Sequence, residues 1–486
     1  MEKTKKRDGF KHSVAVAYGD GIGPEITQAV LNILHAAEVP LQFEEVVLGE
    51  RLYLAGHSSG IDDGAWEIIR RNKVLLKGPI TTPRGGGYKS LNVTMRKALG
   101  LYSNIRPCVS YAPYVATKHP NMDVVVIREN EEDVYAGIEH RQTDEVVQCL
   151  KLITRPGCER IIRFAFEYAR VYGRKKVSCF VKDNIMKQTD GLFYQVFQEI
   201  AAEYPQIEST NFIVDIGIAR LADSPSDFDV IVLPNLYGDI VSDVTAQLSG
   251  SVGLAGSGNV GDHGALFEAI HGSAPDIAGR DLANPSGLLQ AAVQMLQYLQ
   301  LPTYADRIFQ AWAYTLEEGY HTADIFEKNT SVMQVGTQAF AQRVIANLGK
   351  RSSKFKLAKA KSGESLQLKP YIRKEPARKL LRGVDLFLDW RGVDPNELAE
   401  RVAHVHPSLE LTMITNRGVK VWPGRFEETF CTDHWRCRLE AKAGEVDRLD
   451  VPAAVQQAIL AGCEVIKTEN LYEFDGVKGY SLGQGQ

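Results

Sequence analysis

The sequence lacks long apolar runs and carries little net charge. A transmembrane helix needs about 20 consecutive, predominantly apolar residues, and no such run occurs within the 486 residues. We therefore expect no membrane partner. The formal net charge of −4 argues against a general nucleic-acid binder, whose surface would be strongly basic. We expect no nucleic-acid partner either.

Cysteines are also few. Seven are scattered over the chain, and a sparse, odd-numbered set is typical of reduced thiols rather than of a disulfide framework. The basic segment 3–7 is not followed by the apolar region of a secretion signal. These features predict a reducing compartment, and we expect a cytoplasmic location.

What the sequence does contain is an alternation of strand-like and helix-like segments. Hydrophobic residues make up 44% and charged residues 24% of the chain, as in globular proteins, and the length predicts two or three domains. Strands are predicted at Val14–Tyr18, Val74–Leu76, Val124–Arg128, Val177–Val181 and Val230–Leu233, with amphipathic helices between them, for example at 158–171 and 190–203. The pattern predicts an α/β fold.

A glycine-rich loop follows the first predicted strand. It reads GDGIG at 19–23, and a helix is predicted to open at Pro24, a favourable first-turn residue. The glycine spacing does not fit the G-x-G-x-x-G fingerprint of a dinucleotide-binding Rossmann fold. We therefore predict an α/β fold that is not of the Rossmann type.

The composition changes near Lys350. Residues 350–382 contain twelve lysines and arginines against two acids and lack apolar periodicity, which predicts a basic linker. Residues 383–486 then follow the order β-α-β-β-α-β, which predicts a separate ferredoxin-like α+β domain.

Arginines and small polar residues gather in two segments, 78–107 and 128–140. Arg96, Arg106 and Arg128 offer forked donors that match carboxylates better than point charges do. Ser90 and Asn92 add uncharged donors. Together these residues predict a binding site for a small polycarboxylate.

Acidic residues follow one of the predicted strands. Asp239 and Asp243 lie four positions apart, on one face of a helix, after the strand that ends at Leu233. Sites of α/β proteins form at the carboxyl ends of strands. Asp215, between apolar residues, is a third candidate. Ligand sets made only of oxygen select hard cations, so these acids favour Mg²⁺ or Mn²⁺ over zinc.

The segment HGSAPDIAGRDLANP, residues 271–285, combines small residues with a carboxylate. Gly272, Ser273 and Ala274 let backbone amides approach a ligand closely. Asp276 can accept hydrogen bonds from both hydroxyls of an adenosine ribose, and its charge would repel a 2′-phosphate. Taken alone, the segment is equally compatible with an ordinary turn before a helix at Pro285.

These motifs together closely resemble the metal-dependent β-decarboxylating dehydrogenases, the isocitrate and isopropylmalate dehydrogenase family, over about residues 12–348. The resemblance implies a three-layer α/β/α fold with a large domain (1–98 and 253–349) and a small domain (99–252). It also implies a short dimer clasp, because only 47 positions separate Tyr135 from Lys182. Residues 383–486 are similar to the extension of a subgroup of larger bacterial isocitrate dehydrogenases.

The resemblance further implies what individual residues do. The substrate would be held by Thr82, Ser90, Asn92, Arg96, Arg106 and Arg128. The metal would be held by Asp239 and Asp243 with Asp215 donated by the other subunit. The cofactor would contact Asn184, Glu268, His271, Gly272, Ser273, Ala274, Asp276, Ile277 and Asn284. Lys182, reaching across the dimer, would accept the proton of the substrate hydroxyl, and Tyr135 would deliver a proton after decarboxylation.

The activity implied is the oxidation and decarboxylation of isocitrate to 2-oxoglutarate and CO₂ in the tricarboxylic acid cycle. In the resembled family an Asp-Ile pair at 276–277 goes with NAD, so we expect NAD as the cofactor, with NADP as the alternative. Ser90 and Asn92 favour isocitrate over isopropylmalate or homoisocitrate.

The assembly implied is a homodimer with shared active sites. A catalytically silent regulatory subunit is disfavoured because Tyr135, Lys182 and the three aspartates are all present. For residues 383–486 we expect a role in assembly, which would give a higher oligomer, and keep a regulatory ligand-binding role as the alternative. Trp390, Trp422 and Trp435 are the candidate interface anchors there, although such large aromatics are equally suited to a core.

Overall fold

The computed structural model describes residues 12–57, 60–82, 90–361, 364–424 and 428–483. The chain divides into two compact units. The first comprises residues 1–135, 152–184 and 190–371, and the second comprises residues 136–151, 185–189 and 372–486. The second unit therefore contains the predicted clasp as well as the predicted C-terminal domain.

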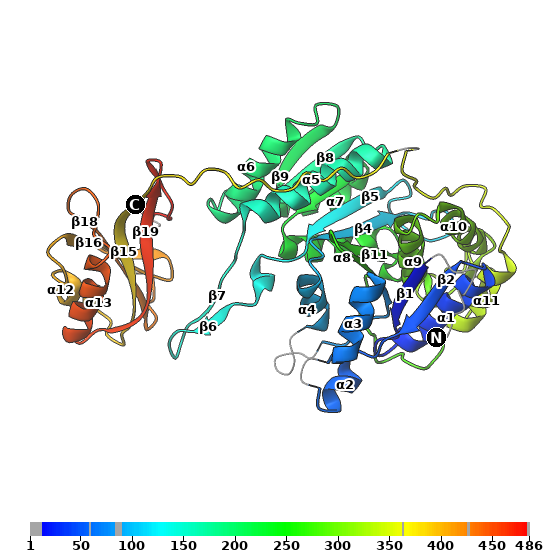
Figure 1. Cartoon of the computed structure of the whole chain (residues 1–486), viewed down its shortest axis with the longest axis horizontal. Coiled ribbons are helices and arrows are strands. Elements are labelled where there is room, and N and C mark those ends of the chain that lie inside the picture. Colours follow the sequence, from blue (N-terminus) through cyan, green and yellow to red (C-terminus); the bar gives the residue numbers. More distant parts are fainter. Residues whose placement is uncertain (1–11, 58–59, 83–89, 362–363, 425–427, 484–486) are drawn as a thin grey trace, which may run out of the picture. The chain divides into compact units, whose positions relative to one another are not determined.

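The first unit is built on a ten-stranded mixed sheet (Figure 1), in the order β2-β1-β3-β12-β11-β4-β5-β10-β8-β9. The strands are β1 (His12–Ala17), β2 (Leu41–Glu45), β3 (Val74–Lys77), β4 (Ser103–Val109), β5 (Asp123–Glu129), β8 (Lys176–Val181), β9 (Glu208–Ile213), β10 (Val230–Leu233), β11 (Gly256–Val260) and β12 (Ala265–Ala269). Strand β4 runs antiparallel to β5, and β11 runs antiparallel to both β4 and β12. The other pairings in the sheet are parallel.

Helices cover both faces of this sheet. They are α1 (Gly23–Ala36), α2 (Glu50–Leu54), α3 (Asp63–Asn72), α4 (Leu91–Ala98), α5 (Arg155–Tyr172), α6 (Thr189–Ala201), α7 (Val214–Asp223), α8 (Asn235–Leu248), α9 (Ser286–Tyr298), α10 (Pro302–Glu317) and α11 (Thr337–Ala346). Successive residues of a strand point to opposite faces, and in β1 Val14 and Val16 belong to one apolar cluster while Ala15 and Ala17 belong to another. The predicted three-layer α/β/α fold is confirmed. No helix among the described residues is both long and apolar enough to cross a membrane.

The GDGIG loop packs closely against neighbouring segments of the first unit. Gly21 has a φ of +57°, and a Cβ there would lie 2.0 Å from the main-chain oxygen of Ser273. The Asp20 carboxylate accepts hydrogen bonds from the amides of Glu50 and Thr81, at 3.1 and 2.9 Å. The loop thus packs against the segment that begins at His271, as a glycine-dependent close contact.

The basic segment after Lys350 runs along the first unit as far as Tyr371. Arg351 and Lys359 both pair with Asp306, at 3.0 and 3.1 Å, and the Lys369 ammonium lies 2.9 Å from Glu203. The Phe355 ring packs edge-on against Tyr111, with ring centroids 5.2 Å apart. Much of the positive charge in this segment is therefore neutralised by acids of the folded unit.

The second unit contains a six-stranded sheet in the order β17-β16-β18-β15-β19-β20. Its elements are β15 (Lys379–Asp389), α12 (Pro395–Val402), β16 (Leu409–Asn416), β17 (Val419–Trp422), β18 (His434–Ala441), α13 (Asp450–Leu460), β19 (Glu464–Phe474) and β20 (Val477–Lys478). This is the predicted ferredoxin-like α+β order with a short strand added at each edge. Trp435 is fully buried and Trp390 packs on it, with ring centroids 5.2 Å apart, so these tryptophans belong to the core.

Candidate active site

Two buried arginines meet at Asp239 near the start of α8. Arg106 projects from β4 and Arg128 from the adjacent strand β5. The Arg106 guanidinium lies 3.5 Å from Asp239 and donates to Asp243 at 3.2 Å. Arg128 forms an ion pair with Asp239 and donates to the side-chain oxygen of Asn235 at 2.7 Å. The two arginines are only 4% and 1% exposed.

The electrostatics of this cluster favour an anionic ligand. Burial acts to raise the pKa of Asp239, but Arg128 and Arg106 outweigh it, and the pKa lies below its ordinary value. Burial raises the pKa of Asp243, which Arg106 offsets only in part. Burial, together with the charges of Arg106 and Arg96, lowers the pKa of Arg128 to about 9. The carboxylates therefore compensate the buried positive charge incompletely, and a carboxylate ligand would complete the compensation.

Several polar atoms of the predicted substrate site have no partner. Within the described residues, Arg96 Nε, Arg106 Nε and Asn92 Oδ1 are buried without a hydrogen bond. Buried polar groups without a partner are uncommon and costly. Arg96 and Asn92 lie on α4, whose first residue follows Ser90. Thr82 is exposed, and residues 83–89 of the same predicted loop lie outside the described residues.

Tyr135 joins this cluster from the segment after β5. Its hydroxyl donates to Asp239 Oδ2 at 2.6 Å, and Arg128 lies over its ring, 5.0 Å from the centroid. Burial raises the pKa of Tyr135. Its phenol is therefore protonated near neutral pH and lies beside the arginines that would bind the substrate.

Lys182 and Asp215 form a second group. The Lys182 ammonium donates to Asp215 at 2.9 Å, and this ion pair lowers the pKa of Asp215. The main-chain amide of Lys182 donates to the buried carboxylate of Asp190 at 2.7 Å. Among the described residues, no hydrogen bond or ion pair joins Lys182 or Asp215 to Asp239, Asp243 or Tyr135. The predicted catalytic residues thus lie in two groups within one chain.

The predicted metal ligands are divided in the same way. Within the described part of the chain, no cluster of three histidine, cysteine or acidic side chains could hold a metal ion. Asp239 and Asp243 share the Arg106 guanidinium, whereas Asp215 is exposed beside Lys182. The carboxylates suit Mg²⁺ or Mn²⁺ chemically, but the described residues of one chain do not bring all three together.

Glu268 lies at the centre of a buried ion cluster. Its carboxylate accepts from the Lys77 ammonium at 2.8 Å, from Arg96 at 3.0 Å and from the Asn259 side chain at 3.0 Å. Burial acts to raise the pKa of Glu268, but Lys77 and Arg96 hold it well below its ordinary value. Lys77 was not among the residues predicted for the site. The signal was a lysine at the end of an otherwise apolar strand, directly before Gly-Pro.

The predicted cofactor loop follows β12. The Ser273 hydroxyl lies 2.8 Å from that of Thr81, and the Ser273 carbonyl accepts from the amide of Ile22 at 2.8 Å. His271 Nε2 is buried without a partner among the described residues, and burial lowers the pKa of His271. The Asn284 side chain donates to Asp324 at 3.1 Å. Gly272 has open space where a Cβ would point, so the backbone there is accessible to a ligand.

The outer part of this loop carries charges of both signs. Asp276 and Arg280 are exposed, and neither side chain forms a hydrogen bond or ion pair within the described residues. Ala274 has a φ of +36°, and Ile277 packs against the adjacent core. Asn184, also predicted to contact the cofactor, is exposed after β8.

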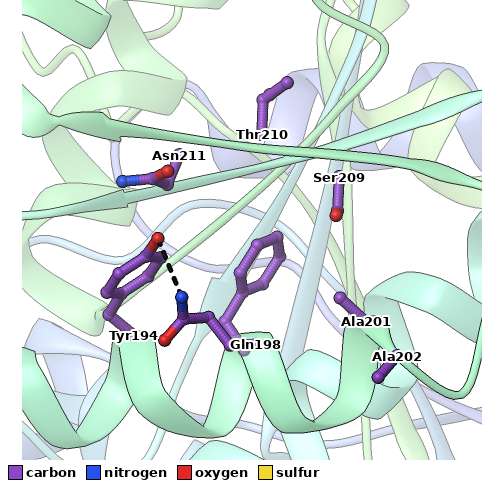
Figure 2. A pocket seen from close by; sticks show the side chains of 8 residues that line it. Tyr194, Gln198, Ala201, Ala202, Ser209, Thr210 and Asn211 are labelled. Carbon is purple, nitrogen blue, oxygen red and sulfur yellow. Dashed lines mark hydrogen bonds between the residues drawn. The ribbon is translucent and has the colours of Figure 1, made fainter.

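A cavity of about 280 Å³ lies elsewhere, between α6 and the edge strand β9. Figure 2 shows Tyr194, Gln198 and Asn211 at its lining, with Gln198 donating to the Tyr194 hydroxyl at 3.2 Å. None of the predicted site residues lines it.

Comparison with known proteins agrees with this geometry. Residues 13–344 match the family described as isocitrate/isopropylmalate dehydrogenase, and residues 379–486 match the C-terminal domain of bacterial isocitrate dehydrogenase. The chain is 52% identical to a Rickettsia bellii protein named "Isocitrate dehydrogenase [NADP]", over 97% of this chain and 99% of the relative. It is 41% identical to a Thermus thermophilus protein of the same name, over 99% and 97%.

A solved structure shows the same fold over the whole chain. The crystal structure of the TT0538 protein from Thermus thermophilus has a TM-score of 0.92 at 40% identity, covering 99% of this chain and 97% of that one.

The prediction of NAD as the cofactor is wrong by this comparison, because the relatives that span nearly the whole chain are named for NADP. The prediction rested on the Asp-Ile pair at 276–277 and on the charge of Asp276 in particular. Asp276 is exposed, no partner among the described residues fixes it, and Arg280 brings the opposite charge four positions later. A single exposed charge does not decide whether a 2′-phosphate is accepted.

Proposed function

The chain belongs to the isocitrate/isopropylmalate dehydrogenase family, and we propose that it oxidises and decarboxylates isocitrate to 2-oxoglutarate and CO₂ in the tricarboxylic acid cycle, with NADP as the oxidant. The observation that carries the proposal is the buried arginine cluster at Asp239, with the unpartnered Nε donors of Arg96 and Arg106. A tricarboxylate is the kind of ligand that this cluster lacks.

The arginines bind and orient the substrate. Arg106 and Arg128 are held by β4 and β5, and Arg96 is held by its ion pair with Glu268 at 3.0 Å. Ser90 and Asn92 on the neighbouring segment provide uncharged donors for the remaining carboxylate. Polar residues at these two positions suit a carboxylate better than the isopropyl group of isopropylmalate.

Lys182 accepts the proton of the substrate hydroxyl during oxidation. Its Nζ donates to Asp215 at 2.9 Å, which holds the side chain in place. Lys182 accepts the proton as the neutral amine, and a cation bound to Asp215 would replace the ammonium as the partner of that carboxylate. Because this pair lies apart from Asp239 within the chain, we propose that a second copy supplies Lys182 and Asp215 to each active site. The assembly is then a homodimer with shared sites.

Tyr135 delivers the proton that completes the product after CO₂ leaves. Its phenol is protonated and hydrogen-bonded to Asp239 at 2.6 Å. Asp239, Asp243 and the other subunit's Asp215 suit Mg²⁺ or Mn²⁺, which would supply charge stabilisation for the enolate. The cofactor would bind along residues 271–284, with Glu268 and Asn184 beside it.

The test is turnover by the purified full-length chain. With isocitrate and Mg²⁺, we expect reduction of NADP coupled to equimolar CO₂, and no reaction with 3-isopropylmalate. Preference for isopropylmalate or homoisocitrate would overturn the substrate, and a larger kcat/KM with NAD than with NADP would overturn the cofactor. Inactivity with every 2-hydroxy acid would indicate a silent regulatory subunit.

A further inference from the structure

Lys182 stands at the point where the support of the sheet ends. It follows Val181, the last residue of β8, and residues 183–184 form a turn. At Val181 the strand is still paired with β9, opposite Ile213. Beyond that pair, the main-chain amide of Lys182 donates to the Asp190 carboxylate at 2.7 Å. A side chain therefore takes over from the sheet in fixing the main chain from which the lysine projects.

Asp190 is well placed to hold Lys182 because it belongs to the first turn of α6 and is fully buried. Helix α6 contributes Phe193 and Val196 to the apolar cluster that also contains Val181 of β8. Protein interiors are close-packed, so a displacement of the buried start of α6 would disturb this cluster. The Asp190 carboxylate is therefore a fixed acceptor for the amide of Lys182.

The same carboxylate reaches the helix that carries Asp239. Burial, the negative charge of Asp190 and a hydrogen bond to its carboxylate raise the pKa of Tyr237, on α8. The Tyr237 ring packs against the apolar cluster that contains Phe180 of β8. Tyr237 precedes Asp239 by two residues, within the same helical turn. Asp190 therefore connects the main chain of Lys182 with the start of α8.

The side chain of Lys182 has a weaker support at its other end. Its Nζ donates to Asp215 at 2.9 Å, and Asp215 lies in the first turn of α7. The Asp215 side chain is 69% exposed, and exposed ion pairs contribute little to stability. A buried hydrogen bond to a charged acceptor contributes more. The contact between Asp190 and the amide of Lys182 is therefore the firmer of the two.

We propose that Asp190 is a positioning residue, which fixes the main chain of Lys182 between α6 and the start of α8. The catalytic consequence rests on the proposed function of Lys182 as the proton acceptor. A proton acceptor must lie within hydrogen-bond distance of the group that it deprotonates, so a shift of its main chain slows the oxidation step. The arginines that bind isocitrate are held by other elements, β4, β5 and α4. Loss of the contact therefore lowers kcat and leaves the KM for isocitrate nearly unchanged.

The experiment compares Asp190→Ala, Asp190→Asn and Tyr237→Phe with the unaltered full-length protein. Alanine removes both acceptor oxygens, so we expect hydrogen exchange of the amides in 182–184 to accelerate about tenfold and kcat to fall about tenfold. Asparagine keeps one oxygen that can accept from the amide, so both quantities should return to within about threefold of the parent. Phenylalanine keeps the ring in its cluster and removes only the link to α8, so its effects should have the same direction and be smaller.

Asp63→Ala is the matched control. Asp63 is an exposed acid in the first turn of α3, a helix that packs on β1 and β3. The variant thus removes an acid from a helix N-terminus far from β8 in the sheet order, and it should alter neither exchange in 182–184 nor kcat.

Unaltered exchange in Asp190→Ala would overturn the link to Lys182. Faster exchange with unaltered kcat, or a raised KM for isocitrate at unaltered kcat, would overturn the positioning role, and so would equal losses of kcat in Asp190→Asn and Asp190→Ala. If Asp190→Ala does not fold, Tyr237→Phe decides by the same two readouts. If the unaltered protein failed to turn over isocitrate, the proposed function would fail while the exchange result still stood.

Discussion

Asp239 in the first unit and Asp385 in the second both lie against buried arginines, but their surroundings differ. Asp385 receives two hydrogen bonds from Arg438, each 2.8 Å long, and Arg438 also donates to the carbonyl of Ser481 at 2.8 Å. Asp239 instead receives Arg106, Arg128 and the Tyr135 hydroxyl.

The two clusters differ in how many arginine donors lack a hydrogen-bond partner. Around Asp385 the carboxylate meets the fork of Arg438, with Arg436 farther away at 3.8 Å, and the bidentate pair has the geometry of a structural ion pair. Around Asp239 the buried Nε of Arg106 and, nearby, of Arg96 have no partner within the described residues, and the pKa of Arg128 is lowered to about 9 by burial and by the other arginines. Incomplete pairing marks the ligand site, and complete pairing marks the structural contact.

The largest expected effect tests the incompletely paired cluster. Arg106→Gln removes a buried charge that is proposed to bind substrate, so kcat/KM for isocitrate should fall by about a thousandfold, as expected when a buried charged hydrogen bond is lost. Repulsion with Arg128 is relieved, so the melting temperature should change little. Steady-state kinetics and calorimetry check both. Arg401→Gln, which breaks an exposed pair with Glu397, is the control; equal losses in the two variants would contradict the assignment.

Arg438→Met makes the opposite test in the second unit. It leaves Asp385 buried with only Arg436, 3.8 Å away, and breaking a buried ion pair typically costs about 3–5 kcal/mol in the free energy of unfolding. Denaturant unfolding of the C-terminal domain should show this loss, and the additional change Asp385→Leu should restore most of it. Near-normal stability with strongly reduced isocitrate binding would mean that this pair, too, is part of a ligand site.

The Tyr135 hydroxyl donates to Asp239 and has no counterpart at Asp385, and Tyr135→Phe tests its role. Removing it takes away the proton donor but keeps the ring under Arg128, so turnover should fall about a hundredfold with the KM for isocitrate nearly unchanged. Rapid quench should show that hydride transfer persists while release of 2-oxoglutarate slows. Equal slowing of both steps would place Tyr135 outside the proton transfer.

Glu129 is a buried acid of a third kind, because neither an arginine nor a lysine pairs with it among the described residues. Glu129 forms no ion pair within the described residues, and burial together with Glu132 raises its pKa to about 8. A raised pKa means that the folded state binds the proton more tightly than the unfolded state, so this stabilisation is complete at low pH and is lost as pH rises through about 8. Glu129→Gln should therefore stabilise the protein by about 2 kcal/mol at pH 9 and little at pH 5. A pH-independent difference between variant and parent would contradict this.

The architecture could be predicted because buried parallel strands consist of short apolar runs, such as Val230–Leu233. It missed the strands that carry polar or small residues. Strand β4 includes Asn104, Arg106 and Pro107, and β11 reads GSGNV. In both, pairing in the middle of the sheet overrides weak local propensity.

The residues of the candidate site also divide into those with a local sequence signal and those without one. Side chains that stand at strand ends, such as Arg128 and Lys182, could be predicted from their places in the pattern. Lys77 and Asp190 could not, because their roles depend on contacts with residues remote in sequence: Lys77 with Glu268, and Asp190 with Tyr237. Such contacts leave no periodic signal.

The smallest expected effect concerns the exposed charges of the cofactor loop, which resemble neither buried cluster. Asp276 and Arg280 are accessible to solvent and salt, so each contributes about 1 kcal/mol or less to binding a 2′-phosphate. Asp276→Asn removes a repulsive charge and should raise kcat/KM with NADP several-fold, whereas Arg280→Gln should lower it by a similar factor. Arg280→Gln should not alter kcat/KM with NAD, which lacks that phosphate, and the effects of both variants on NADP should shrink at high ionic strength. If the two variants instead changed NAD and NADP equally, the loop would contact the part of the cofactor that NAD and NADP share, and the preference for NADP would have to come from residues outside 276–280.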